Sequence, residues 1–181
     1  IAALPAAAGA QTIVVGGKAF TEQQIMTAMT VALLKAKGFA PDRKAGMGTA
    51  AVRSALENGQ IDVYWEYTGT GLGVFYKITD KFPTPAAAYQ KIKELDAAKG
   101  LVWLNMSPVN NTYAFAMNKD DAQKRGIVTM SDLAKAINGG AKLTFASNAE
   151  FYARPDGLPG WQTAYGFEFD RENVKRMDTG L

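Results

Sequence analysis

The 181-residue sequence contains no cysteine and no histidine. Without them the chain cannot form the usual zinc sites, carry out thiol chemistry or ligate haem and iron–sulfur clusters. Every nucleophile arrangement that pairs serine or cysteine with histidine is excluded as well. We therefore expect a protein that is not an enzyme and that has neither a metal nor a cofactor. The absence of cysteine leaves the cellular compartment open, because envelope proteins also fold without disulfides.

Positively charged residues are only slightly in excess of negatively charged ones. Lys and Arg number 20 against 17 Asp and Glu, which gives a formal net charge of +3 and a pI near 9.0. The basic residues are scattered and form no stripe, so we expect no nucleic-acid partner. The hydrophobic share of 48 % and the charged share of 20 % are typical of a globular chain with one or two domains.

The sequence at both ends indicates that the chain has been cut there. Residues 1–10 (IAALPAAAGA) are small and apolar, as at the end of a secretory signal, and are too few to span a bilayer. We expect residues 1–11 to be the remnant of a signal peptide or a linker, and the protein to be exported to the periplasm or another extracytoplasmic space. At the other end the chain stops where a helix is about to begin at Thr179, so we expect a C-terminal truncation.

Between the ends, strand patterns alternate with helix patterns, which predicts an α/β fold with largely parallel sheets. Strands are expected over residues 12–15, 61–67, 101–104, 112–117 and 143–146. Helices are expected over residues 22–37, 49–58, 85–99 and 131–137, the first with a capping box of Thr21 and Gln24. A break at residues 105–111 is the predicted crossing between lobe 1 (12–106) and lobe 2 (107–181).

Gly16, Gly17 and Lys18 precede the first predicted helix, as in an anion-binding turn. The nucleotide motifs GxxxxGK[ST] and GxGxxG are missing, so a carboxylate or another small anion fits this turn better than a nucleotide. Tyr67 and Thr70 lie where a predicted strand enters a glycine-bearing loop, a usual place for binding groups in α/β folds.

Two further candidates lie in the second half of the chain. Tyr113 follows the predicted crossing, and Arg154 stands in the segment FYARPDGLPG, whose prolines make it rigid. An arginine held in this way can grip a carboxylate through two parallel hydrogen bonds. We expect Asp156 to orient the Arg154 loop, and Trp161 and Tyr165 to be packing residues.

Five segments in order carry a resemblance to a known family. They are GGKAFTEQ (16–23), ENGQIDVYWEYTGTGL (57–72), NNTYAF (110–115), SDLA (131–134) and FYARPDGLPGWQTAYGFEF (151–169). Together they resemble the substrate-binding protein of osmoprotectant ABC transporters, which take up glycine betaine, choline, carnitine and related quaternary amines. The resemblance runs from about residue 12 to the end.

The resemblance implies a two-lobed, hinged periplasmic binding protein fold (type II) with the ligand in the interlobe cleft. It implies an ammonium cage of Tyr67 and Tyr113, with the Asn111 backbone close to the methyl groups. It places Lys18, Thr70 and Arg154 on the carboxylate side. Aromatic faces suit a trimethylammonium group, because its charge is spread over methyl groups that donate no ordinary hydrogen bonds.

The implied partners are a small quaternary ammonium ligand and the permease subunits of an ABC transporter with its cytoplasmic ATPase. We expect the full-length protein to be a monomer. The family continues beyond Leu181, so a molecule that ended there would have an incomplete cage and weak or absent binding. The alternative is a binding or sensory domain of the same fold for another solute such as an amino acid, whose α-amino group Glu66 would recognise.

Overall fold

The computed structural model describes residues 11–177. Residues 1–10 of the predicted signal or linker remnant (1–11) and the predicted helix start at Thr179 lie outside the described residues. The chain divides after Glu66 into two compact units, here named unit 1 (up to Glu66) and unit 2 (from Tyr67). The predicted lobe boundary between residues 106 and 107 is a different division and stays a prediction.

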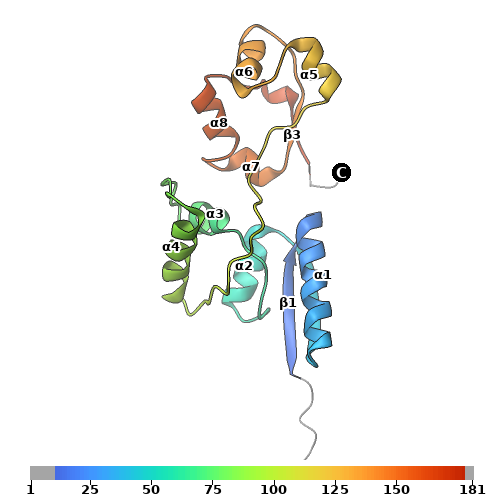
Figure 1. The fold of residues 1–181 in the computed structure, drawn as a ribbon, viewed down its shortest axis with the longest axis vertical. Coiled ribbons are helices and arrows are strands. Elements are labelled where there is room, and N and C mark those ends of the chain that lie inside the picture. Colours follow the sequence, from blue (N-terminus) through green and yellow to red (C-terminus); the bar gives the residue numbers. More distant parts are fainter. Residues whose placement is uncertain (1–10, 178–181) are drawn as a thin grey trace, which may run out of the picture. The chain divides into compact units, whose positions relative to one another are not determined.

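Unit 1 is built on a parallel pair of strands. β1 (Thr12–Lys18) pairs with β2 (Ala40–Met47), and α1 (Thr21–Ala36) forms the crossover between them (Figure 1). α2 (Thr49–Glu57) follows β2. The sequence pattern did not predict β2, because its residues APDRKAGM include three charges and a proline and no β-branched side chain.

The two glycines before Lys18 belong to β1 and not to a turn, so the interpretation as an anion-binding turn is wrong. A Cβ atom at Gly16 would collide with Ile61, and one at Gly17 would collide with Thr27. The glycines therefore let β1 approach its neighbours closely. The predicted capping box is also wrong, because α1 begins after Phe20 and its N-cap makes no side-chain hydrogen bond.

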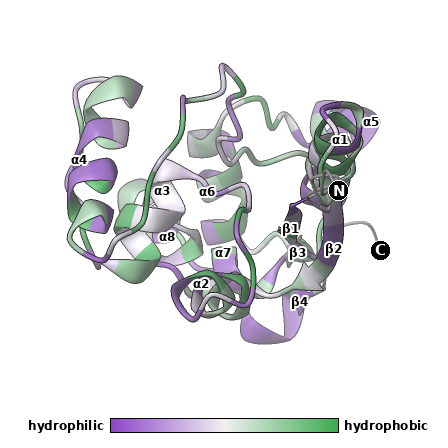
Figure 2. Ribbon diagram, turned by 90° about the horizontal axis from the view of Figure 1, so that it is seen from below, coloured by the Kyte–Doolittle hydropathy of each residue, from purple (hydrophilic) through white to green (hydrophobic). Residues whose placement is uncertain are grey.

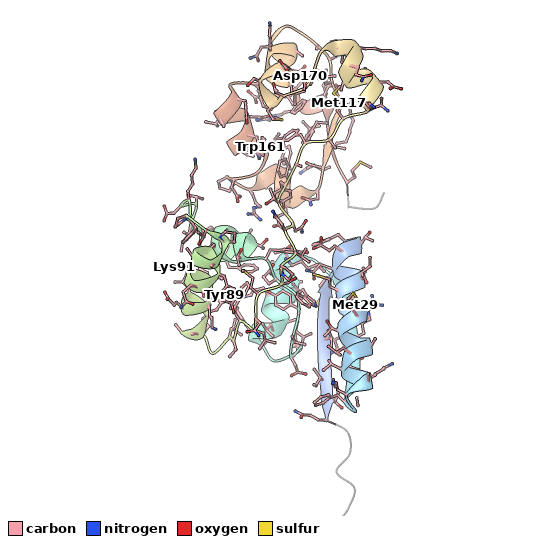
Figure 3. The ribbon with its side chains drawn as sticks, in the orientation of Figure 1. Met29, Tyr89, Lys91, Met117, Trp161 and Asp170 are labelled. Carbon is pink, nitrogen blue, oxygen red and sulfur yellow. The ribbon has the colours of Figure 1, made fainter. Side chains whose placement is uncertain are left out.

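Helix α1 turns polar residues toward β1 and apolar residues to the surface. Gln23 and Thr27 are fully buried, whereas Ile25, Met29 and Leu33 are more than half exposed. Met29 is labelled on α1 in Figure 3. Hydrogen bonds and close backbone approach, more than apolar packing, therefore fasten α1 to β1.

The strand predicted over residues 61–67 is reduced to a single parallel bridge between Val15 and Val63. The Val14 amide donates its hydrogen bond to the Asp62 carboxylate. In a regular sheet this amide would donate to the backbone of the neighbouring strand. Ile61 nevertheless joins the small core of unit 1 with Val52 and Ala55.

In its first part, unit 2 contains α3 (Thr68–Thr70), η1 (Gly71–Phe75) and α4 (Pro85–Ala97). Thr84 caps α4, and Pro85 occupies its first turn as the sequence predicts. Hydrophilic and hydrophobic residues are mixed around α4 (Figure 2). Its buried Asp96 accepts hydrogen bonds from Tyr76 and the Trp103 indole at 2.8 and 2.6 Å.

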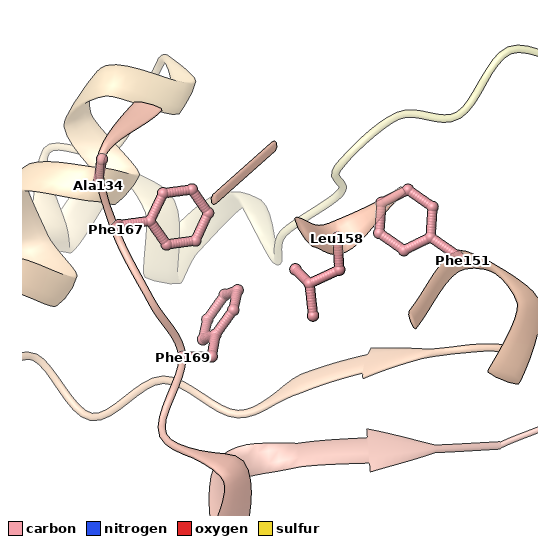
Figure 4. Packing of buried hydrophobic residues seen from close by; sticks show 5 residues of the cluster. All are labelled: Ala134, Phe151, Leu158, Phe167 and Phe169. Carbon is pink, nitrogen blue, oxygen red and sulfur yellow. The ribbon is translucent and has the colours of Figure 1, made fainter. Parts of the chain in front are cut away.

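Small helices and a second parallel strand pair make up the rest of unit 2. The elements are α5 (Lys119–Arg125), α6 (Met130–Asn138), β3 (Phe145–Ser147), α7 (Ala149–Ala153), α8 (Leu158–Tyr165), η2 (Arg171–Asn173) and β4 (Val174–Arg176). β3 pairs with β4. The buried residues that form the hydrophobic core of this part of unit 2 are Ala134, Phe151, Leu158, Phe167 and Phe169 (Figure 4).

Four local predictions in unit 2 need correction. The strands predicted over residues 101–104 and 112–117 have no regular secondary structure, and Val102 and Leu104 are largely exposed. Helix α6 begins at Met130, one residue before the predicted start at residue 131, and Thr129 caps it in a capping box with Asp132. Strand β3 begins at Phe145, two residues later than predicted.

The surface exposure of the apolar residues on α1 can be tested by replacing isoleucine with alanine at two positions of unit 1, one buried and one on α1. Ile61→Ala should lower the free energy of unfolding by about 2–5 kcal/mol, because Ile61 is only 2 % exposed. Ile25→Ala should change it by less than about 0.5 kcal/mol, because Ile25 is 55 % exposed. Urea unfolding of both variants gives the two values. Equal losses would contradict the exposed position of Ile25.

Candidate ligand-binding site

Arg154 is held at the end of a short anchored helix. The Asn148 side chain caps α7 by accepting the Phe151 amide at 2.7 Å, and Phe151 is buried in the core of unit 2. Arg154 follows directly after the last residue of α7, and Pro155 comes next. The guanidinium is therefore carried by a backbone that is fixed on both sides.

All five N–H donors of the Arg154 guanidinium have an acceptor. The two carboxylate oxygens of Asp156 accept hydrogen bonds from Nε at 2.8 Å and from Nη2 at 2.6 Å. Nη1 donates to Glu150 at 2.9 Å and to the Thr70 hydroxyl at 3.3 Å. Nη2 also donates to the Gly69 carbonyl at 3.3 Å. Asp156 thus orients the arginine as predicted, and a ligand carboxylate has to displace one of these acceptors.

The loop that receives Arg154 is the glycine-bearing segment after Tyr67. Thr70 is buried there, and a Cβ atom at Gly73 would lie 3.5 Å from Nη2 of Arg154. A Cβ atom at Gly71 would crowd Ile92 of α4. The close approach to α4 therefore requires a glycine at position 71, whereas a Cβ atom at position 73 would make only an ordinary contact with the arginine.

Tyr113 completes the group around Arg154. Its ring centroid lies 4.7 Å from that of Phe151 and 5.7 Å from the guanidinium carbon of Arg154. Burial, followed by the charge of Glu150, raises the pKa of the Tyr113 phenol. The ring therefore stays neutral and offers an aromatic face to a cation.

Lys18 lies in unit 1, at the end of β1, and is buried. Its Nζ atom is 2.5 Å from one carboxylate oxygen of Glu66, and the Tyr64 hydroxyl donates to the other oxygen at 2.9 Å. Burial, followed by the charge of Glu66, raises the pKa of the Tyr64 phenol. The alternative of an amino-acid ligand assigns Glu66 to the α-amino group of that ligand, whereas in the structure Glu66 binds the amino group of Lys18.

The structure brings three of the six predicted site residues into contact, namely Thr70, Tyr113 and Arg154. Tyr67 is half-buried and caps α3, its carbonyl accepting the Gly71 amide at 2.9 Å. Asn111 is exposed in the irregular segment that leads to Tyr113. The ligand roles of all six residues stay predictions.

Sequence reasoning missed Glu150, the second carboxylate on Arg154. Its spacing of four residues from Arg154 is the signal that could have revealed it, because residues i and i+4 are neighbours on a helix. It also missed the Lys18–Glu66 pair, whose members are 48 residues apart and have no local signal.

A pocket of about 350 Å³ adjoins the Arg154 cluster. Its walls include Gly69 and Asp156, together with residues of η1 and of the chain leading into α4. This volume is in the range of small-molecule sites. Over residues 11–177, no helix is long and apolar enough to cross a membrane.

The sequence matches one protein family over nearly its whole length. The model for the substrate binding domain of ABC-type glycine betaine transport system (OpuAC) covers residues 11–181. The chain belongs to this OpuAC family. The family predicted from the sequence is therefore confirmed.

Two relatives show how much of an OpuAC-family protein is present. A glycine-betaine-binding protein of Pseudomonas aeruginosa is 43 % identical over 180 residues, which cover 96 % of this chain and 58 % of that protein. The glycine betaine-binding protein YehZ of Escherichia coli is 33 % identical over 174 residues, which cover 94 % of this chain and 57 % of YehZ. The chain thus spans less than two thirds of the length of these relatives.

Solved structures agree with the family. Apo YehZ has a TM-score of 0.59 at 32 % identity, covering 95 % of this chain and 62 % of that one. A glycine betaine/carnitine/choline ABC transporter structure has a TM-score of 0.63 at 25 % identity, covering 93 % of this chain and 61 % of that one. These similarities confirm the predicted α/β fold class.

The Asp156–Arg154 contact predicts a pH dependence of stability. Hydrogen bonds from Arg154 hold the pKa of the Asp156 carboxyl below its usual range. Ionised Asp156 therefore stabilises the fold above its unfolded pKa of about 4, and this contribution is lost as the pH falls through the lower folded-state pKa. The difference in unfolding free energy between wild type and Asp156→Asn, measured in urea, should be constant from pH 7 to about pH 5 and shrink below about pH 4.

An Arg154→Gln background provides the control for this measurement. There the same Asp156→Asn substitution should show much less dependence on pH, because the hydrogen bonds that shift the pKa are gone. A wild-type difference that stays constant down to pH 2 would contradict the contact.

Proposed function

We propose that this chain is the ligand-capturing part of a binding protein that delivers a quaternary ammonium osmoprotectant, such as glycine betaine or choline, to an ABC importer. The observation that carries the proposal is the family match over residues 11–181. The names of the two relatives, both glycine betaine-binding proteins, support it over the alternative of an amino-acid or sensory domain.

The contacts around Arg154 support a ligand with a carboxylate at one end. The guanidinium and the buried Thr70 hydroxyl lie together and form the proposed carboxylate side, to which the resemblance adds Lys18. Because all five guanidinium donors are engaged, binding is an exchange of acceptors. Glu150 is the acceptor proposed to yield, since Asp156 holds the guanidinium through two bonds and Glu150 through one.

The aromatic side of the proposed site consists of Tyr113 and Tyr67, with the Asn111 backbone beside them. A desolvated cation on an aromatic face gains about 0.5–2 kcal/mol per ring, so several rings are needed for tight binding. In this proposal the ammonium end of the ligand meets aromatic rings, and the carboxylate end meets the Arg154 guanidinium.

The remaining parts of the proposal concern the whole protein. We propose that it is exported, acts as a monomer without catalysis or cofactor, and hands its ligand to permease subunits driven by a cytoplasmic ATPase. Membership in a family of substrate-binding domains supports a binding role.

Isothermal titration with glycine betaine and choline tests the proposal, on the 181-residue chain and on the full-length protein that carries it. Tyr113→Ala should weaken binding of both ligands by about 2- to 30-fold, the loss of one cation–aromatic contact. Tyr165→Ala is the matched control. Tyr165 is 41 % exposed against 38 % for Tyr113, and its ring also stacks on a neighbouring aromatic, Trp161.

The control variant should bind as the wild type does. Equal weakening by both substitutions would remove Tyr113 from the site. Absence of binding to both ligands in the full-length protein would overturn the proposed function.

A further inference from the structure

Unit 1 contains a buried ion pair that the proposed ligand contacts do not explain. Lys18 and Glu66 are both almost completely buried, at 3 % and 5 % side-chain exposure, and their charged atoms are 2.5 Å apart. The Tyr64 hydroxyl donates a hydrogen bond to the second carboxylate oxygen of Glu66. Both carboxylate oxygens therefore have a donor, which is the arrangement that makes a buried charge tolerable.

The pair belongs to a longer polar network. The charge of Arg53 of α2 acts on the Tyr64 phenol and lowers its pKa against the larger effects of burial and Glu66, and the buried Arg53 forms an ion pair with Glu57 at 2.7 Å, one helical turn away. The two cations of this network are balanced by two carboxylates. Removing one carboxylate leaves the network with a net positive charge.

Backbone contacts fix the positions of both members of the pair. The fully buried Gln23 accepts the Lys18 amide at 3.4 Å and donates to the Trp65 carbonyl at 3.0 Å. It thereby ties the end of β1 to the residue before Glu66. The Lys18–Glu66 distance is thus set by the framework of unit 1 and not by two mobile side chains.

The sequence positions of the pair connect it with ligand binding. Lys18 is the proposed carboxylate contact, and Glu66 immediately precedes Tyr67, a proposed cage residue. A buried ion pair adds little net stability, because desolvation of the charges offsets their attraction. Stability alone is therefore a weak reason for a carboxylate at position 66.

We propose that Glu66 is a specificity-determining residue, because its carboxylate competes with a ligand carboxylate for the Lys18 ammonium. The consequence is a shift of preference away from zwitterionic betaines and toward cationic alcohols such as choline. The inference rests on the proposed function, since it concerns the same site. It goes beyond that function in naming the group that sets the ratio of the two affinities.

The test is the ratio of the dissociation constants for glycine betaine and choline, measured by titration calorimetry on the full-length protein that carries this chain. Choline has the same trimethylammonium group and a neutral hydroxyl in place of the carboxylate, so it controls for the cage. Glu66→Gln keeps the shape and the acceptor oxygen but removes the competing charge. We expect it to shift the ratio at least tenfold in favour of glycine betaine.

Glu57→Gln is the matched control in the same network. It removes the same charge from unit 1, at a carboxylate that is bonded to Arg53. We expect it to change the ratio less than twofold. A shift as large as that of Glu66→Gln would overturn the inference, because the cause would then be the total charge of unit 1.

Circular dichroism establishes that each variant folds. If Glu66→Gln does not fold, Glu66→Asp decides, because it keeps the charge but draws the carboxylate back from Lys18. We expect it to shift the ratio about threefold in the same direction. An unchanged ratio in the folded variant overturns the inference and leaves the proposed function standing, whereas failure of the wild type to bind either ligand overturns both.

Discussion

The hydrogen bonding of the buried Arg154 guanidinium is the constraint on which the candidate site depends. A guanidinium taken out of water needs an acceptor for every donor, because each unmet donor costs free energy. Here the carboxylates of Glu150 and Asp156 meet the charge, and Thr70 and Gly69 meet the remaining donors. The four-residue spacing between Glu150 and Arg154 meets part of this need, because it places the carboxylate next to the guanidinium.

The aromatic core of unit 2 gives this cluster its fixed position. Tyr113 and Phe115 are two residues apart in a segment without regular secondary structure, and both rings contact Phe151, at 4.7 and 5.9 Å between centroids. Phe115 also stacks on Phe145 of β3 at 5.1 Å. The strand predicted over residues 112–117 is absent from the structure, yet the two alternate side chains Tyr113 and Phe115 both reach Phe151. One anchor, Phe151, thus positions both the aromatic ring and the arginine of the candidate site.

Features with a local signal could be predicted from the sequence, and features that depend on distant partners could not. Helix α4 begins at Pro85 and is followed by Gly100 with a φ of 74°, as proline and glycine preferences require. The strand expected over residues 61–67 failed, because strand formation depends on a neighbour far along the chain. The residues of the candidate site divide in the same way. The composition of their loops pointed to Arg154 and Thr70, whereas the pairing of Lys18 with Glu66 could be seen only in the folded structure.

Both cations proposed to hold a ligand carboxylate already bind a carboxylate of their own chain. Lys18 is bound by Glu66, and Arg154 by Glu150 and Asp156. A ligand therefore gains only the difference between two similar interactions at each position, so the carboxylate end contributes less affinity than two unengaged cations would. At the ammonium end, the Tyr113 ring already has one cation near it, the Arg154 guanidinium at 5.7 Å from the ring centroid, but an aromatic ring attracts a further cation without first releasing an anion. This difference argues that the cage supplies most of the affinity and that the paired cations determine which quaternary amines are accepted.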